Sequence, residues 1–180
     1  VLTLIKRVNT SAFTPASPDP SGIVFVPSLN RFLISDSEVD EMPALFTSAN
    51  LFEATLAGAA VRAGNTLGYS TEPTGMGFNP ANGHLFLSDD NKREIFEMAP
   101  GADGLYGTGD DSITSFDTAV FNALDPEDVT YDNTAGVLWI VDSTNAEVYR
   151  VAPGPNGRFD GIQTAGGDDL VTNFDVQSLY

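Results

Sequence analysis

Two glycine-rich loops hold most of the residues that could bind a metal ion. The first loop, residues 101–111, has Asp103 near its start and the pair Asp110 and Asp111 at its end. The second loop, residues 154–169, repeats this order with Asn156, Asp160, Asp168 and Asp169. Calcium takes roughly six to eight oxygen ligands, and glycines let backbone carbonyls turn toward the ion. The two loops therefore predict Ca²⁺ sites with these side chains as ligands.

The same loops also fit an interpretation without metal. Asp, Asn and Gly are common in turns because they hydrogen-bond their own backbone or accept positive φ angles. The spacing of the acids does not match an EF-hand loop. The equivalent stretch near the N-terminus, residues 57–62, contains no acid at all. Calcium sites and ordinary turns are thus two open interpretations.

Glu127 and Asp128 form another candidate metal site, at the start of an expected strand. Glu127 stands where earlier parts of the chain have Ser21 and Thr74, so an acid is not a general requirement there. A solvated strand start is the alternative interpretation.

Other polar residues indicate structure rather than catalysis. Asp36, Asp89 and Asp142 recur at equivalent positions after a strand, where a carboxylate can accept hydrogen bonds from the next turn. His84 is the single histidine, and we expect it at an exposed strand start. No Ser-His-Asp arrangement is predicted around it.

The composition of the chain excludes some classes of binding partner. The 180 residues include 25 acids and 8 bases, for a formal charge of −17. This balance argues against nucleic acid, which needs clustered Lys and Arg. No apolar run approaches the roughly 18 residues of a membrane-spanning helix, so we expect no membrane insertion. The absence of cysteine, the acidic loops and a first residue other than Met predict a secreted protein, extracellular or periplasmic.

The elements that position these residues repeat with a period of 53 residues. One set of aligned segments is 19–25, 72–78 and 125–131. A second set at the same offset is 32–36, 85–89 and 138–142. The chain thereby divides into an N-terminal strand and connection (1–18) and three units: 19–71, 72–124 and 125–180.

Each unit has four short apolar runs separated by Gly, Asn, Asp and Pro, which is typical of β-strands. We expect first strands at 21–26, 74–78 and 127–131, and second strands at 31–35, 84–88 and 137–141. We expect third strands at 50–56, 93–98 and 146–151, and fourth strands at 60–63, 112–116 and 170–174. One four-stranded antiparallel meander per repeat predicts an all-β protein made of β-propeller blades.

The segment from Asp125 to Ser143, with the sequence DPEDVTYDNTAGVLWIVDS, resembles a blade of NHL-repeat propellers. It is also similar to the gluconolactonase (senescence-marker-protein) type and to the SdiA-regulated and esterase-like-phytase propellers. The resemblance implies the propeller architecture and says little about activity. Likeness to gluconolactonase blades implies a metal ligand on the propeller axis at Glu127, although Asp128 replaces the glycine of that motif.

The number of blades predicts an incomplete ring. Three blades are too few to close, because propellers have about four to eight. An alternating segment, Leu2 to Val8, adds one extra N-terminal strand that resembles the fourth strand of a preceding blade. We therefore expect a partial propeller, completed by another copy or by the remainder of a longer chain.

Two functions fit these features. The first is a secreted, acidic, calcium-binding propeller module with a binding or structural role. The alternative is a metal-dependent hydrolase of the lactonase, phosphatase or phytase kind, with its site on the propeller axis. A metal count on the purified chain separates the metal-binding interpretations from a propeller without metal.

Overall fold

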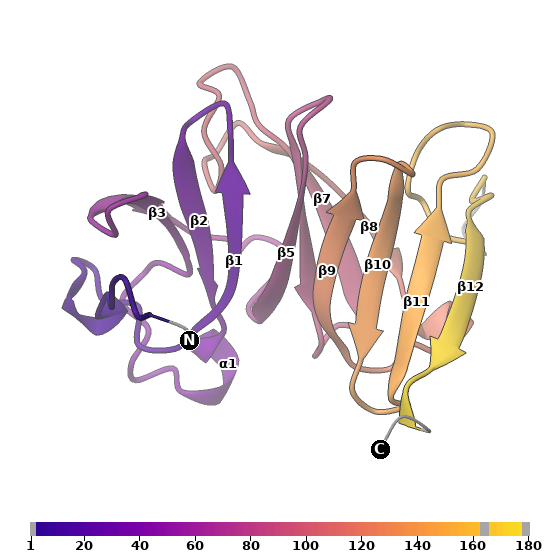
Figure 1. The fold of residues 1–180 in the computed structure, drawn as a ribbon, viewed down its shortest axis with the longest axis horizontal. Coiled ribbons are helices and arrows are strands. Elements are labelled where there is room, and N and C mark those ends of the chain that lie inside the picture. Colours follow the sequence, from indigo (N-terminus) through magenta and orange to yellow (C-terminus); the bar gives the residue numbers. More distant parts are fainter. Residues whose placement is uncertain (1–2, 163–165, 178–180) are drawn as a thin grey trace.

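The chain folds into three antiparallel sheets of four strands each (Figure 1). The computed structural model describes residues 3–162 and 166–177. In each sheet the strands follow one another in chain order, so that every sheet is a simple meander. Within these described residues, no helix is long and apolar enough to cross a membrane.

Each sheet is one blade of the expected repeat. Blade 1 contains β1 (Pro20–Val26), β2 (Arg31–Asp36), β3 (Leu51–Thr55) and β4 (Ala60–Gly64). Blade 2 contains β5 (Pro73–Asn79), β6 (His84–Asp89), β7 (Glu94–Ala99) and β8 (Ser112–Asp117). Blade 3 contains β9 (Pro126–Asp132), β10 (Val137–Asp142), β11 (Glu147–Ala152) and β12 (Leu170–Asp175). The helical elements are short: η1 (Thr10–Ala12), α1 (Glu38–Glu41) and η2 (Ala119–Phe121).

The fold class and the strands expected in the three blades are confirmed, because all twelve of these strands are present. The turns between first and second strands contain the glycines that the sequence places there. Gly83 and Gly136 have φ angles of 78° and 67°, a conformation that strongly favours glycine. Their amides donate to the carbonyls of Asn79 and Asp132 at 2.9 and 2.8 Å, which closes each hairpin.

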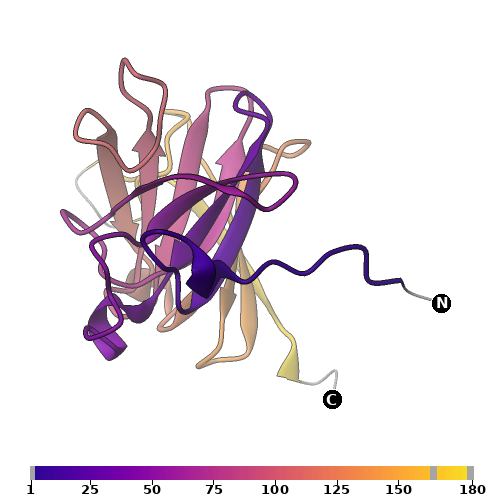
Figure 2. The same cartoon turned by 90° about the vertical axis from the view of Figure 1, so that its left-hand side faces the viewer.

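The expectation of an extra N-terminal strand is wrong for residues 3–8, which are the part of that segment that the structure describes. Residues 3–8 have no strand structure and form an extended arm that leads away from blade 1 (Figure 2). A fourth strand forms by pairing with a third strand, as β4 pairs with β3. The arm has no third strand of a preceding sheet to pair with, so its alternating sequence alone does not produce a strand.

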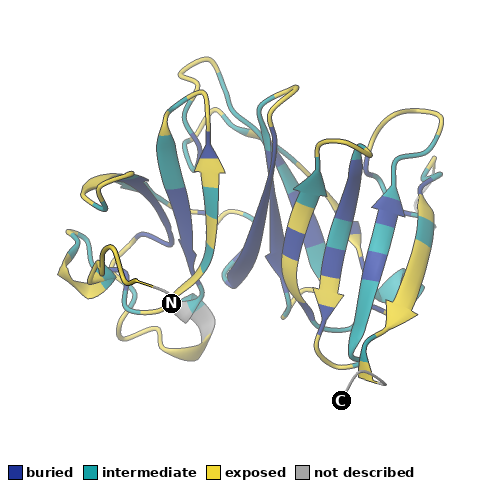
Figure 3. Ribbon diagram, viewed as in Figure 1, coloured by how far each residue is buried: buried dark blue, intermediate teal, exposed yellow. Residues whose placement is uncertain are grey.

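Most of the core lies between the blades (Figure 3), and a smaller buried cluster lies within blade 1. Blades 1 and 2 enclose a cluster that includes Leu33, Met76 and Leu85. Blades 2 and 3 enclose a second cluster around Phe86, which stacks on Tyr131 at 5.8 Å. β5 is buried along its whole length because it belongs to the central blade. The outer strand β12 is mostly exposed.

Candidate metal site in the third blade

The blade 3 loop, residues 154–169, joins β11 to β12 and is pinned by a buried aromatic ring. Phe159 is 7% exposed and meets Phe86 edge-on at 5.3 Å. Just before it, the Arg158 amide donates to Asn156 Oδ1 at 2.7 Å, which sets a tight Asx turn. Asp160 follows Phe159 directly, so the buried ring fixes the backbone position from which the Asp160 side chain extends.

Three carboxylates converge in this loop. Asp160, Asp168 and Asp169 each place an oxygen within 4.8 Å of the others. They come from opposite ends of the loop, and the Asp169 amide donates to the Gly161 carbonyl at 3.1 Å to hold those ends together. Like charges at this distance repel one another, so the arrangement favours a bound cation. All three ligand groups offer oxygen, which suits Ca²⁺.

Asp169 is the buried member of the trio, with 5% of its surface exposed. Its carboxylate accepts hydrogen bonds from the amides of Asp160 and Gly161 at 3.0 and 2.8 Å, and from Gly154 at 3.3 Å. Burial raises the pKa of Asp169, and the charge of Asp160 adds to this effect, while the amide donors oppose it. The backbone amides therefore hold the Asp169 carboxylate in a buried position where its negative charge is destabilising.

Asp168 supplies the clearest sign of a missing partner. Its Oδ1 atom is buried and has no hydrogen-bond partner among the described residues. A Cβ added to Gly154 would lie 2.3 Å from this oxygen, so only glycine leaves room for the carboxylate there. A buried oxygen without a donor is destabilising, and a cation would satisfy it. The residues present thus fit a calcium ion.

Asn156 lies at the edge of this trio. Its amide nitrogen donates to Asp160 Oδ2 at 2.8 Å, while its oxygen is used by the Arg158 amide. In this position Asn156 orients Asp160 and turns no oxygen of its own toward the carboxylates. Its role as a direct ligand stays a prediction.

The blade 2 loop, residues 101–111, holds its acids differently. The hydroxyl of Thr108 donates to Asp110 Oδ1 at 2.7 Å, and its amide donates to Asp111 Oδ2 at 2.9 Å. Asp103 accepts from the Leu105 amide at 2.8 Å. Asp103, Asp110 and Asp111 are not among the three-ligand groups found in the described residues. A calcium site here stays a prediction.

Glu127 belongs to a second acidic group, at the junction of blades 2 and 3. Oxygens of Asp90, Asp125 and Glu127 lie within 4.8 Å of one another. Burial raises the pKa of Asp90, and the charges of Glu127 and Asp125 add to it. Asp128 is outside this group, and its Oδ1 accepts from the Val129 amide at 2.9 Å. Asp90 and Asp125 were not expected here, because their proximity depends on how two blades pack.

The recurring aspartates have the structural role expected for them. Asp36, Asp89 and Asp142 are almost completely buried. Asp36 accepts from the Ser17 hydroxyl at 2.6 Å, and Asp89 accepts from the Ser70 hydroxyl at 2.7 Å. Asp142 accepts from the Asp125 amide at 3.0 Å. Each carboxylate thereby ties the connection that enters a blade to the end of its second strand.

His84 has a partner that the sequence did not indicate. Its Nδ1 lies 2.5 Å from Glu97 Oε1 on the adjacent strand β7. The pair lines a cavity of about 410 Å³, together with Ser112 and Thr114 of β8 and Arg158 of the blade 3 loop. The side chain of His84 is 30% exposed, so the expected strand start is half-buried rather than open.

Known structures share this arrangement of sheets, although no family model and no curated protein matches the sequence. Virginiamycin B lyase from Staphylococcus aureus aligns over 88% of this chain with a TM-score of 0.51 and 14% identity. The β-propeller domain of Cps50 (Swd1) from Myceliophteria thermophila aligns over 88% with a TM-score of 0.52 and 14% identity. Kuenenia stuttgartiensis hydrazine synthase aligns over 89% with a TM-score of 0.51 and 9% identity.

The chain folds as part of a β-propeller. It spans 41%, 43% and 47% of the lengths of those three chains, respectively, which is consistent with a partial propeller. At such low identity the likeness establishes the fold alone. The membership in NHL or gluconolactonase propellers that the sequence suggested stays a prediction.

Proposed function

We propose that this chain is a calcium-binding β-propeller module with a binding or structural role. The observation that carries the proposal is the convergence of Asp160, Asp168 and Asp169 around the buried, unpartnered Asp168 Oδ1. In this proposal, Ca²⁺ offsets the repulsion among the three carboxylates and locks the two ends of the blade 3 loop together. Metal binding then contributes to folding, by roughly 2.7 kcal/mol when free Ca²⁺ is a hundredfold above the dissociation constant.

The test is calorimetric titration with CaCl₂ of the wild type, Asp168→Asn and the matched blade 2 variant Asp110→Asn. We expect Asp168→Asn to weaken Ca²⁺ binding at least about tenfold, because it removes the charge at the unpartnered oxygen. Asp110→Asn should leave this site unchanged. If the wild type binds no Ca²⁺, or if Asp168→Asn binds as tightly as the wild type, the site proposed here is wrong.

We further propose that the module works outside the cytoplasm, as a secreted protein in an extracellular or periplasmic space. The support is a cysteine-free, strongly acidic chain whose candidate ligands are oxygens only. Calcium sites of extracellular modules have dissociation constants of about 10⁻⁴ to 10⁻³ M. A dissociation constant in that range supports this location, whereas submicromolar affinity argues for a cytosolic buffer or sensor.

The alternative function is a metal-dependent hydrolase, and the group of Asp90, Asp125 and Glu127 favours it. Such a group could hold a metal ion that activates water, with Glu127 contributed by the first strand of blade 3. Hydrolysis of p-nitrophenyl phosphate and of gluconolactone should be assayed with Mg²⁺, Mn²⁺ and Ca²⁺. Metal-dependent turnover that Glu127→Gln abolishes and Asp168→Asn retains would establish this second site.

A further inference from the structure

The loops of blades 2 and 3 each pack against the blade that precedes them. Tyr106 of the blade 2 loop belongs to the same buried cluster as Leu33 of blade 1. Phe159 of the blade 3 loop packs on Phe86 of blade 2. Leu33 and Phe86 are one 53-residue period apart, and so are Tyr106 and Phe159. The two interfaces can therefore be compared residue by residue.

At the first interface, an arginine fills the space between blade 1 and the blade 2 loop. Glu53 of β3 lies opposite Leu33 and is 6% exposed. Its Oε2 accepts from Arg62 Nε of β4 at 3.1 Å, and its Oε1 lies 3.6 Å from Arg31 Nε of β2. Arg62 Nη2 also donates to the Tyr106 carbonyl. The Arg62 guanidinium thus bridges a carboxylate of blade 1 and a carbonyl of the blade 2 loop.

At the second interface, the equivalent carboxylate lacks this arginine. Glu97 of β7 lies opposite Phe86 in its sheet, which makes it the counterpart of Glu53. Opposite Glu97 on β8 is Thr114, at the place that Arg62 takes in blade 1. Threonine has a short side chain without charge. The second interface therefore keeps the carboxylate and has no cation at the matching position of β8.

A cavity lies where the arginine is replaced. Its volume is about 410 Å³, and it is lined by Glu97 and Thr114 of blade 2 and by Phe159 of the blade 3 loop. His84 Nδ1 lies 2.5 Å from Glu97 Oε1, which leaves Glu97 Oε2 without a partner among the described residues. The Phe159 carbonyl stands at the position of the Tyr106 carbonyl, the other acceptor of the first interface. The cavity thus offers the acceptors that a guanidinium group uses one period earlier.

The blade 3 loop adds a positive charge to the same cavity. Arg158 lines it and is itself exposed. The matching residue of the blade 2 loop is Leu105, so this cation is specific to the second interface. Arg158 forms no ion pair with Glu97 or with any other described residue. The cavity therefore has a carboxylate and a guanidinium on its wall that do not neutralise each other.

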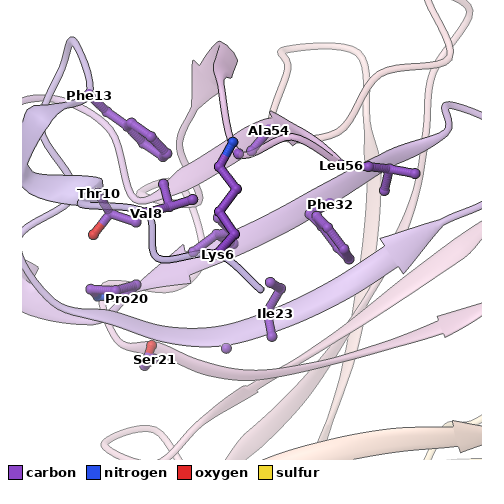
Figure 4. Close-up of a pocket in the computed structure, with 13 residues that line it drawn as sticks. Lys6, Val8, Thr10, Phe13, Pro20, Ser21, Ile23, Phe32, Ala54 and Leu56 are labelled. Carbon is purple, nitrogen blue, oxygen red and sulfur yellow. The ribbon is translucent and has the colours of Figure 1, made fainter. Parts of the chain in front are cut away.

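A cavity of similar size over blade 1 has a different chemistry (Figure 4). Its volume is about 340 Å³, and its lining includes Val8, Ile23 and Phe32. The charged residue of this lining is Lys6, and no carboxylate belongs to it. A cationic ligand is therefore attracted to the cavity between blades 2 and 3 rather than to the one over blade 1.

We propose that the cavity between blades 2 and 3 binds a small guanidinium compound that also carries a carboxylate. The guanidinium of the ligand binds Glu97 and the Phe159 carbonyl, as Arg62 binds their counterparts at the first interface. The carboxylate of the ligand binds Arg158. Hydrogen bonds between a guanidinium and a carboxylate are charge-assisted and can form in pairs, which favours this class of ligand over a neutral one. The site is separate from the calcium proposal, because Asp160 is the residue of the acidic trio that lines the cavity.

The first test is calorimetric titration of the full chain with L-arginine. L-citrulline is the matched ligand, because it has a neutral ureido group in place of the guanidinium. We expect the wild type to bind L-arginine and to bind L-citrulline at least about tenfold more weakly. Glu97→Gln should weaken L-arginine binding by a similar factor. Glu94→Gln is the control, because Glu94 lies on the same strand and does not line the cavity.

The second test supplies the missing arginine from the chain itself. Thr114→Arg places a guanidinium where blade 1 has Arg62, so it should abolish L-arginine binding and raise the thermal unfolding midpoint. Glu97→Gln in the same background should remove that rise, because the new arginine then has no carboxylate. If Thr114→Arg impairs folding, the titrations of wild type and Glu97→Gln with the two amino acids still decide the proposal.

The third test concerns Arg158 and the calcium site. Arg158→Leu, which copies the blade 2 loop, should weaken binding of L-arginine and leave binding of agmatine, which lacks the carboxylate, unchanged. Asp168→Asn should lose Ca²⁺ and keep L-arginine binding, so that failure of one proposal is distinguishable from failure of the other. A wild type that binds no L-arginine, or that binds L-citrulline equally well, would overturn the proposal. An Arg158→Leu variant that binds L-arginine more tightly would overturn it too, because Arg158 would then be the cation that occupies the cavity.

Discussion

The loops of blades 2 and 3 share one plan but arrange their charges differently. Gly101 and Gly154 occupy the same position, and each would clash with an aspartate of its own loop if it carried a Cβ. Both loops also bury an aromatic ring at the same position, Tyr106 in blade 2 and Phe159 in blade 3. The common scaffold thus brings the end of each loop back to its beginning.

The difference lies in what the acids meet. In blade 2, the hydroxyl and amide of Thr108 satisfy Asp110 and Asp111, and Asp110 faces solvent. In blade 3, Asp160 is added to the cluster, and Asp168 Oδ1 is buried without a partner among the described residues. The same turn can therefore satisfy its carboxylates with its own donors or depend on a cation. Which of the two applies is decided by one added carboxylate and by the donors nearby.

The largest effect should come from removing the ring that pins the blade 3 loop. Phe159→Ala should lower the free energy of unfolding by about 3–5 kcal/mol, because it leaves a cavity beside Phe86 and Tyr131. It should also abolish Ca²⁺ binding, since Asp160 is then no longer fixed. Urea unfolding and calorimetry measure the two effects.

Phe174→Ala is the control for this change, because Phe174 is 51% exposed on β12. We expect it to cost less than about 1 kcal/mol and to leave Ca²⁺ binding intact. Equal losses for the two variants would mean that Phe159 does not anchor the loop.

A smaller effect is expected from filling the space beside Asp168. Gly154→Ala should cost about 1–3 kcal/mol, because its Cβ would lie 2.4 Å from the Asp168 carbonyl oxygen. Gly101→Ala should cost a similar amount, since it meets the Asp110 carbonyl oxygen at 2.6 Å. Only Gly154→Ala should weaken Ca²⁺ binding, which sharpens the contrast between the loops.

Gly109→Ala is the neutral reference, because a Cβ there meets nothing within 4 Å. Thermal unfolding with Ca²⁺ and with chelator separates the cost of the clash from the loss of metal. A Gly154→Ala variant that keeps full Ca²⁺ affinity would show that Asp168 is not a ligand.

Strands were the most predictable part of this molecule. The 53-residue period and the alternation of apolar runs place all three blades, because both signals are local or repeat at a fixed offset. The arm at residues 3–8 shows the limit of that reasoning. Its alternating sequence is suited to a strand, but a strand also needs a neighbour, and sequence alone does not say whether one is present.

The acidic groups were only partly predictable for a related reason. Asp168 and Asp169 stand out as a pair, and their proximity to Asp160 follows from one loop. Asp125 is only two residues from Glu127, but Asp90 lies in another blade, so only the packing of the two blades brings Asp90 to them. The ability of Thr108 to satisfy two carboxylates also depends on side-chain geometry that spacing does not specify.

The smallest effect, and the most specific one, is an opposite response of the two loops to pH in the metal-free protein. Burial and the nearby Asp160 raise the pKa of Asp169 above its ordinary value. The folded state then binds a proton more tightly than the unfolded state, so stability falls as pH rises through the folded pKa. The hydrogen bond from Thr108 instead lowers the pKa of Asp110. Its contribution is present above the unfolded pKa of about 3.9 and is lost as pH falls through the folded value.

The measurement is the free energy of unfolding against pH in EDTA for the wild type, Asp169→Asn and Asp110→Asn. The free energy of unfolding of the wild type, measured relative to Asp169→Asn, should fall as pH rises. Measured relative to Asp110→Asn, it should increase as pH rises. Saturating Ca²⁺ should reverse the sign for Asp169 alone, because the ion competes with protons for that carboxylate. Two slopes of the same sign in EDTA, or no reversal by Ca²⁺, would mean that the loops do not differ in the way their hydrogen bonds indicate.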